Sequence, residues 1–236
     1  MKSYTIHFIR HGATEGNEEG RYIGLTDLPL SASGTASLKK LQCANLYPKA
    51  QIYISSPLKR CTQTLEILYP GEKAVLINDF RECDFGEWEG KTAKEIAAAD
   101  ESFSRWVTGN GQSVTPPGGE SGGAFMYRVC AAFEKLVESM LRSGTQSAVI
   151  VTHGGVIMSV LSAYGLPKAK FYDWMTANGC GYSMRITPGL WMRSMVGEIY
   201  AEIPGNQECA YENKAAVDIA RKAAADAFGK DDKKKN

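Results

Sequence analysis

The chain of 236 residues lacks several features that would mark whole classes of protein. Its 27 basic and 26 acidic side chains nearly cancel, so it has no excess of positive charge for binding a nucleic-acid backbone. No apolar run approaches the roughly 20 residues that a membrane-spanning helix needs. Residues 1–9 are too short and too interrupted for the apolar core of a signal peptide. We therefore expect a cytoplasmic protein with neither a nucleic-acid partner nor a membrane partner.

Closely spaced cysteine pairs are also absent from the sequence, although the chain contains six cysteines. Zinc sites built from cysteine usually show two ligands a few residues apart. Without such pairs and without an export signal, we expect reduced thiols and no structural metal. The six cysteines are Cys43, Cys61, Cys83, Cys130, Cys180 and Cys209.

Short β-branched runs alternate with stretches of helical spacing through most of the chain. This rhythm favours a mostly parallel sheet with helices on both faces. We therefore expect an α/β fold, a three-layer α/β/α sandwich with a small lid of helices and loops over the carboxyl edge of its central sheet. The expected strands are residues 4–9, 51–55, 74–77 and 147–152, and the expected helices are residues 31–46, 57–68 and 122–141.

Two regions depart from this rhythm. Residues 110–119 have the glycine and proline content of a loop, and together with the short helix-like pieces before them they predict a lid over 91–121. Residues 204–236 are expected to be a C-terminal extension to a single domain over 1–203. Within the extension, an alanine-rich stretch predicts a helix over 212–228 with a thin apolar stripe, followed by a disordered, lysine-rich tail.

Histidine is scarce, and two of the three histidines occupy equivalent places in the sequence. His11 and His153 each follow a short apolar, strand-like run and precede a glycine. A strand that ends in this way places the side chain at the carboxyl edge of the sheet, where open α/β sheets bind ligands. Arg10 lies beside His11, which indicates an anionic substrate. His7 falls inside the first expected strand and is expected to have a structural role.

A set of ordered motifs resembles the histidine phosphatase superfamily, the phosphoglycerate mutase-like proteins. The resemblance extends over roughly residues 4–203, and it is greatest to the branch of α-ribazole phosphatases and broad-specificity phosphatases. It implies an α/β fold and phosphoryl transfer through a phosphohistidine. The motifs are RHGAT at 10–14 with Asn17, GRYIGLTDLPL at 20–30, SSPLKRCTQT at 55–64, RECDFGEWEG at 81–90, PPGGES at 116–121 and HGG at 153–155.

The residue types in these motifs suit phosphoryl transfer. Neutral imidazole is a good nucleophile, and a phosphohistidine splits one hard displacement into two easier ones, so His11 is the candidate nucleophile. The charge on the phosphoryl oxygens needs fixed cations and donors, which Arg10 and Arg60 offer as planar forks. The leaving alkoxide needs a proton. The resemblance assigns that role to Glu82, which would then act as the base for the attacking water.

The expected site therefore combines charged side chains with a second histidine and backbone donors. The expected catalytic residues are His11, Glu82, His153, Arg10 and Arg60. The expected phosphate-binding residues are Arg10, Asn17, Gly24, Arg60, His153 and Gly154.

Several of these assignments have competing interpretations. Asn17 also suits a turn cap. Asp84, Glu87 and Glu89 lie close enough in sequence to Glu82 to compete as the acid. A zinc site built from the two glycine-flanked histidines and an acid would be opposed by the two arginines. We therefore expect neither a metal nor a cofactor.

These features together predict a metal-independent phosphomonoesterase for a small phosphorylated metabolite, with α-ribazole 5′-phosphate as a candidate substrate. One alternative is a cofactor-dependent phosphoglycerate mutase. It is weakened because the residues after Glu82 are closer to the phosphatase branch and because the chain lacks the longer basic cap insertion of the mutases. Another alternative is a protein that binds phosphate esters without turnover. We expect a monomer or a homodimer, and no residue pattern selects between them.

Overall fold

The computed structural model describes residues 2–44, 47–110 and 113–205. The helix expected over 212–228 and the tail after it lie outside the described residues. Seven strands form one sheet in the order β3-β2-β4-β1-β6-β7-β5. These strands are β1 (Tyr4–Arg10), β2 (Ile52–Ser55), β3 (Ala74–Leu76), β4 (Ser147–Thr152), β5 (Gly165–Leu166), β6 (Gly181–Ile186) and β7 (Gly197–Ile203).

The sheet is mostly parallel, as the sequence predicts. Strands β3, β2, β4 and β1 pair in parallel, whereas β6 is antiparallel to both of its neighbours, β1 and β7. The α-helices that surround it are α1 (Glu15–Glu18), α2 (Ala32–Cys43), α3 (Lys59–Leu68), α4 (Ala93–Ala99), α5 (Phe103–Arg105), α6 (Gly122–Ser143), α7 (Gly154–Tyr164) and α8 (Pro188–Ser194).

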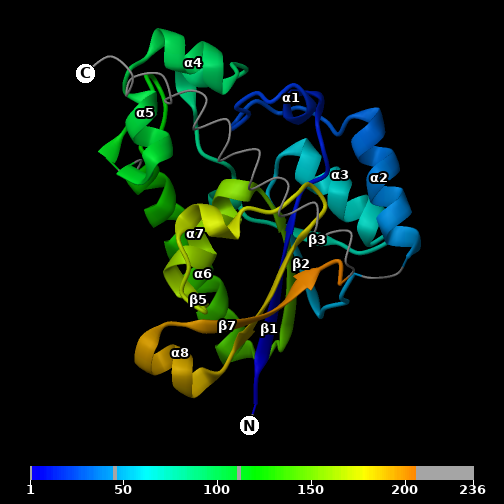
Figure 1. Ribbon diagram of the computed structural model, residues 1–236. Helices are drawn as coiled ribbons and strands as arrows, with labels where there is room; N and C mark the ends of the chain where they lie inside the picture. The colour runs from blue at the N-terminus through cyan, green and yellow to red at the C-terminus, as the bar shows by residue number, and fades with distance from the viewer. Residues whose placement is uncertain (1, 45–46, 111–112, 206–236) are drawn as a thin grey trace.

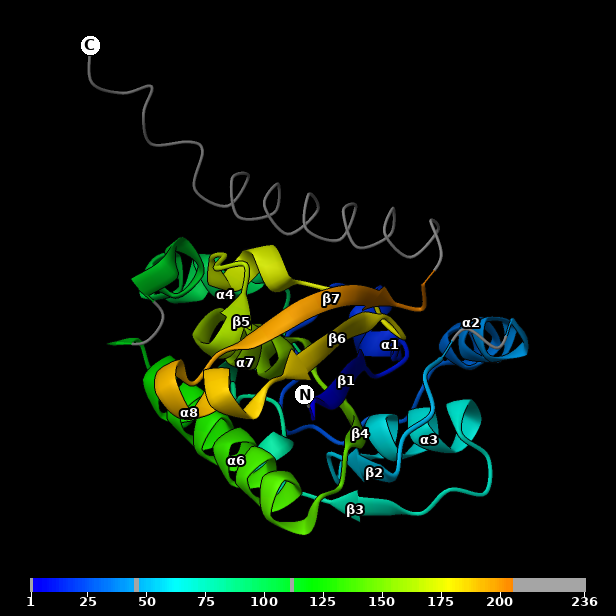
Figure 2. The same ribbon diagram turned by 90° about the horizontal axis from the view of Figure 1, so that it is seen from below.

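Helices cover both faces of this sheet, with α6 and α7 on one side and α2 and α3 on the other (Figure 1 and Figure 2). Side chains alternate along β1 between the two cores that result. Phe8 packs into the core beneath α6 and α7, and Ile9 packs into the core beneath α2 and α3. This arrangement is the expected α/β fold with a mostly parallel sheet.

Local sequence signals account for where α2 begins and for where α6 begins and ends. Ser31 precedes α2 and accepts a hydrogen bond from the Gly34 amide, which satisfies one of the free donors of the first turn. Ser121 caps α6 in the same way, and Gly144 ends α6 at a φ of 76° that favours glycine. The residues of α6 that its spacing predicts to be apolar core are all buried. They are Phe125, Val129, Phe133, Leu136 and Met140.

Residues 91–121, for which a lid is predicted, contain α4, α5 and a short π-helix (Trp106–Asn110). A small hydrophobic core formed by Trp88, Ile96, Phe103 and Val114 joins this segment to the residues just before it. It lies at the end of the molecule toward which β1 runs (Figure 1). The segment is therefore placed on the side of the sheet where the carboxyl ends of the parallel strands meet.

Most of the helices and strands that sequence patterns did not predict lie in the second half of the chain. Helix α7 is apolar on nearly all sides, because it packs between α6 and the sheet, so no amphipathic stripe marks it. Strand β5 has only two residues, and β6 and β7 carry a register irregularity at Ser183 and Met184. Short or irregular strands give little periodic signal in a sequence.

One prediction about cysteine is wrong. Cys43, Cys61, Cys83 and Cys130 are free thiols, but Cys180, just before β6, is disulfide-bonded. The absence of close pairs in the sequence does not exclude a disulfide, because the fold decides which thiols approach one another.

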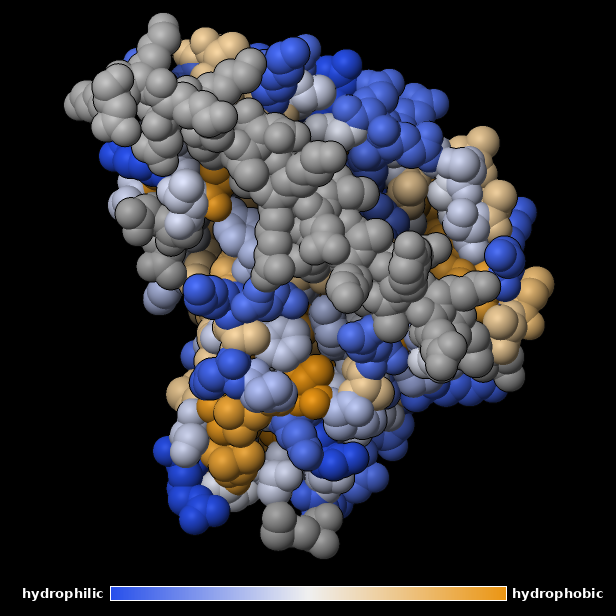
Figure 3. Space-filling view, viewed as in Figure 1, coloured by the Kyte–Doolittle hydropathy of each residue, from blue (hydrophilic) through white to orange (hydrophobic). Residues whose placement is uncertain are grey.

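The described surface carries a few exposed apolar side chains but no helix that is long and apolar enough to cross a membrane. Among the exposed side chains are Met192 on α8, Met195 just after it and Tyr200 on β7. In the view of Figure 3, a cluster of apolar residues lies at the lower left of the visible surface, and hydrophilic residues dominate its upper right.

Candidate active site

Two neighbouring parallel strands bring the glycine-flanked histidines together. Arg10 at the end of β1 pairs in register with Thr152 at the end of β4, so the next residue of each strand is a histidine. The His11 amide donates to the Thr152 carbonyl at 2.9 Å. The ring centroids of His11 and His153 are 5.2 Å apart. Both side chains therefore lie at the carboxyl edge of the sheet, where the sequence pattern predicts them.

A backbone hydrogen bond defines the chemical state of the His11 ring. Its Nδ1 lies 2.7 Å from the Gly12 carbonyl oxygen, and because a carbonyl only accepts, Nδ1 carries the proton. The lone pair of the neutral ring is then on Nε2. Burial, together with the charges of Arg60 and Arg10, holds the pKa of His11 well below its usual value. His11 is thus a neutral imidazole with a fixed tautomer at neutral pH.

His153 has the opposite tautomer. The Arg60 Nε donates to His153 Nδ1 at 3.3 Å, so Nδ1 is the unprotonated nitrogen. The proton on Nε2 is directed to Ser56 Oγ at 2.8 Å. Burial and the neighbouring positive charges hold the pKa of His153 well below its usual value. In this state the donor of His153 bonds to Ser56, although the sequence predicts it to be a phosphate-binding donor.

Arg10 combines one fixed donor with one free donor. Its Nη1 donates to the Thr176 carbonyl at 2.6 Å, which anchors the guanidinium. Its Nε is buried and has no hydrogen-bond partner among the described residues. A buried donor without a partner is unfavourable by about 1–3 kcal/mol, so this nitrogen is well suited to an anionic ligand. Gly154 lies beside it, since a Cβ at Gly154 would be 3.5 Å from Arg10 Nε.

Arg60, near the start of α3, is fully buried. Its Nη1 donates to the Thr26 carbonyl at 2.8 Å and its Nη2 donates to the Gly24 carbonyl at 2.6 Å. Two backbone carbonyls and the His153 ring therefore fix the guanidinium plane. The sequence predicts Gly24 to bind phosphate, but its amide donates to Glu89 at 2.9 Å, and Gly24 contributes to the site through its carbonyl.

Glu82 is held by backbone amides on an irregular segment after a 3₁₀ turn (Asn78–Phe80). Its Oε2 accepts from the Gly155 amide in the first turn of α7, and its Oε1 accepts from the Cys83 amide, both at 3.0 Å. These bonds and the two arginines favour the carboxylate, but burial outweighs them and raises the pKa of Glu82 above its usual value. Glu82 is therefore protonated over a wider pH range than an exposed glutamate.

Asn17 does serve as a cap, but the cap uses only its oxygen. Asn17 Oδ1 accepts from the amide and the hydroxyl of Thr14 at 3.2 and 3.1 Å, and from Asn178 Nδ2 at 3.4 Å. No bond from Asn17 Nδ2 to another described residue is present, so the amide donors are available to a ligand. The two interpretations of Asn17, as a cap and as a phosphate ligand, are therefore compatible.

Sequence reasoning missed a group of residues that fix the site residues through hydrogen bonds. Two of these residues lie on the loop before β6. The Thr176 carbonyl accepts from Arg10, and Asn178 Nδ2 donates to the His11 carbonyl at 2.9 Å. Ser56 Oγ accepts the hydrogen bond from His153 Nε2. No periodic or charge pattern distinguishes these residues, because they act through neighbours that are remote in sequence.

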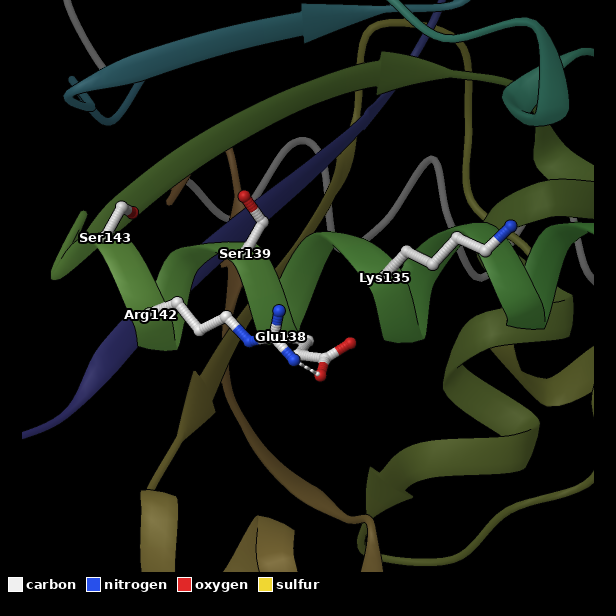
Figure 4. Close-up of a pocket in the computed structure, with 5 residues that line it drawn as sticks. All are labelled: Lys135, Glu138, Ser139, Arg142 and Ser143. Carbon is white, nitrogen blue, oxygen red and sulfur yellow. Dashed lines mark hydrogen bonds and ion pairs between the residues drawn. The ribbon is translucent and has the colours of Figure 1, made fainter.

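The described residues contain no group of three or more His, Cys, Asp and Glu side chains placed to hold a metal ion. A depression of about 420 Å³ lies instead on the outer face of α6, lined by Lys135, Glu138, Ser139, Arg142 and Ser143. Figure 4 shows that an ion pair between Arg142 and Glu138 occupies its surface. None of its lining residues belongs to the site at the sheet edge.

Known proteins match the sequence and the fold of this chain. The sequence profile of the histidine phosphatase superfamily (branch 1) matches residues 6–197. The chain belongs to the histidine phosphatase superfamily.

Relatives of this chain carry both phosphatase and mutase names. The adenosylcobalamin/alpha-ribazole phosphatase of Escherichia coli strain K12 is 27% identical over 179 residues, which are 74% of this chain and 86% of that protein. Phosphoserine phosphatase 1 of Hydrogenobacter thermophilus is 31% identical over 170 residues, which are 70% of this chain and 79% of that protein.

A solved structure that is similar to this chain carries a mutase name. A phosphoglycerate mutase from Thermus thermophilus superposes with a TM-score of 0.62 and 31% identity, covering 84% of this chain and 97% of its own. Both phosphatase and mutase names therefore occur among the proteins that this chain resembles.

Proposed function

We propose that this protein is a metal-independent phosphomonoesterase that transfers the phosphoryl group of a small metabolite to His11 and then to water. One observation carries the proposal most directly. The bond from His11 Nδ1 to the Gly12 carbonyl leaves a lone pair on Nε2, in a buried ring beside the unpartnered Nε of Arg10. A neutral nucleophile next to a free cationic donor suits attack on a phosphate ester.

In the first step, Nε2 of His11 forms a bond to phosphorus as the ester P–O bond breaks. The electron pair of that bond leaves on the alcohol oxygen, which takes a proton from Glu82. Arg10 and Arg60 offset the charge on the phosphoryl oxygens. The phosphorylated ring keeps its proton on Nδ1, where the Gly12 carbonyl accepts it.

In the second step, water attacks phosphorus and the P–N bond breaks, returning its electron pair to Nε2. Glu82, now a carboxylate, takes the proton of the attacking water. The raised pKa of Glu82 suits both roles, because a group that titrates nearer to neutrality gives up and regains a proton more readily. Such general acid–base catalysis contributes about 10²–10⁴-fold.

For the substrate, we propose α-ribazole 5′-phosphate as the first candidate. The support is the similarity to the Escherichia coli phosphatase whose name contains that substrate, over 74% of this chain. The phosphoserine phosphatase of comparable identity makes phosphoserine the second compound to test.

The experiment that tests this function is phosphate release in excess EDTA, with His11→Ala as the control. The substrates are α-ribazole 5′-phosphate, phosphoserine, 3-phosphoglycerate, several sugar phosphates and p-nitrophenyl phosphate. Release that depends on His11 and persists in EDTA supports the proposal, and a preferred compound identifies the substrate class.

The remaining outcomes separate the alternatives. Loss of activity in EDTA would contradict the metal-independent mechanism. A phosphorylated His11 that returns phosphate to phosphoglycerate rather than to water, when 2,3-bisphosphoglycerate is the primer, would identify a mutase. Binding of these esters without acid-labile labelling of wild-type protein would identify a non-catalytic binding protein.

A further inference from the structure

The carboxylate of Glu89 gathers an unusual number of donors from a single turn. Its Oε1 accepts from the amides of Gly24 and Leu25, both at 2.9 Å, and its Oε2 accepts from the Thr26 hydroxyl at 2.7 Å. The Phe85 amide adds a longer contact of 3.4 Å to Oε1. Glu89 therefore binds all three consecutive residues of the 24–26 turn.

The opposite side of the same turn faces Arg60. The carbonyls of Gly24 and Thr26 accept from the two terminal nitrogens of the guanidinium, at 2.6 and 2.8 Å. The turn is thus bound by a carboxylate on one side and by a guanidinium on the other. Hydrogen bonds through the backbone of this turn therefore connect Glu89 with Arg60.

The turn also packs closely against its neighbours at Gly24. A Cβ at Gly24 would clash with the Cys83 carbonyl and with Glu89 itself. Arg60 is fully buried and has no other described acceptor for its terminal nitrogens, so a displaced turn would leave two charged donors unsatisfied. The guanidinium would then move toward other acceptors and away from its place beside His153.

We propose that Glu89 is a positioning residue, which fixes the Arg60 guanidinium for phosphate binding through the 24–26 turn. Glu89 makes no contact with the reacting atoms in this arrangement. This role rests on the proposed function, because Arg60 must be held in place only if it binds the phosphoryl oxygens of a substrate. For comparison, losing the hydrogen-bond partners of metal-ligating side chains lowers affinity or activity by about 10–100-fold.

The test is a double-mutant cycle on the binding of inorganic phosphate, measured by calorimetry with the full chain. The variants are Glu89→Ala, Arg60→Ala and the double variant, with Glu87→Ala as the matched control. Glu87 lies two residues away in the same segment, is exposed, and has no side-chain bond to the described residues. Glu89→Gln, which keeps one acceptor oxygen for the turn amides, is a milder second variant should Glu89→Ala unfold.

We expect Glu89→Ala to weaken phosphate binding by about tenfold or more and Glu89→Gln to weaken it less. In the Arg60→Ala background, removing Glu89 should cause no further loss, because its effect runs through Arg60. Additive losses, or phosphate binding equal to that of wild type in Glu89→Ala, would overturn the positioning role. Failure of wild-type protein to bind phosphate would instead overturn the proposed function, and the positioning role with it.

Discussion

The two halves of the candidate site are built in different ways. His11 and His153 stand at the ends of two paired parallel strands, so the sheet itself sets the distance between them. Glu82 stands on an irregular segment, and its carboxylate is held by two backbone amides from separate elements. Rigid sheet geometry therefore places the nucleophile half, and a network of individual hydrogen bonds places the acid half.

The difference affects how each half tolerates substitution. A side chain at a strand end keeps its position as long as the sheet forms, because many ladder bonds hold the strand in place. The position of Glu82 depends on a few contacts, so single changes at remote residues should disturb it. We expect substitutions in the nucleophile half to act by removing a reacting group. Substitutions in the acid half should act also by displacing the Glu82 carboxylate.

His11→Ala gives the largest expected effect. It removes the atom that accepts the phosphoryl group, so turnover of every substrate should fall by more than about 10³-fold. The measurement is phosphate release together with acid-labile labelling of the protein. His7→Gln is the control: this buried histidine of β1 bonds Ser183 Oγ at 2.8 Å, and its loss should reduce stability more than activity. Substantial activity in His11→Ala would show that His11 is not the nucleophile.

Glu82→Gln should show an effect that depends on the leaving group. An alkyl phosphate needs a proton on its leaving oxygen and should lose about 10²–10⁴-fold, whereas p-nitrophenyl phosphate needs little protonation and should lose much less. The ratio of kcat/KM for the two substrates, measured for wild type and variant, isolates the proton transfer. Equal losses on both substrates would show that another carboxyl group acts as the acid.

The pH dependence follows from the same two groups. Activity on an alkyl phosphate needs a neutral His11 and a protonated Glu82. Because the pKa of His11 is lowered, kcat/KM should fall at the acid end only below the usual range of histidine. Because the pKa of Glu82 is raised, the fall at the alkaline end should begin above the usual range of glutamate, and it should vanish in Glu82→Gln. A profile that keeps this alkaline fall in the variant would contradict the assignment.

The nucleophile half is also the half whose position the sequence predicts without reference to a family. His11 and His153 each follow an apolar run and precede a glycine, and the ends of parallel strands meet at one edge of a sheet, so the two rings are expected to be neighbours. The assignment of Glu82 came only from the resemblance to a family, because nothing in its local pattern separates it from Asp84 or Glu87. Supporting residues such as Thr176 were not predictable, since their contacts exist only after folding.

Gly155→Ala should disturb the acid half without changing any ionisable group. A Cβ at Gly155 would clash with Glu82 Oε1, so the carboxylate must move from the two amides that hold it. We expect a loss of about tenfold or more on alkyl phosphates and a smaller loss on p-nitrophenyl phosphate. A loss that is the same for both substrates would indicate damage to the nucleophile half instead.

The smallest expected effect concerns Arg128 on α6, which ties together the segment around Glu82. Arg128 forms a half-buried ion pair with Glu120 at 2.7 Å, and it also donates to the carbonyls of Asp79 and Arg81 at 2.8 and 3.2 Å. Arg128→Lys keeps the charge but loses the fork that reaches several acceptors at once. The acid should therefore be held less firmly, and kcat on alkyl phosphates should fall a fewfold, with little change on p-nitrophenyl phosphate.

Arg142→Lys is the matched control for this change, because Arg142 lies on the same helix and also pairs with a glutamate, Glu138, but is exposed. Exposed pairs of this kind contribute about 0.3–0.5 kcal/mol to stability, and Arg142 has no contact with the acid segment. If Arg128→Lys and Arg142→Lys behave alike on both substrates, the Arg128 network stabilises the fold without positioning Glu82. A loss confined to Arg128→Lys and to alkyl phosphates would show that the position of Glu82 depends on the bonds of Arg128 to the backbone around it, which include the Glu82 carbonyl at 3.4 Å.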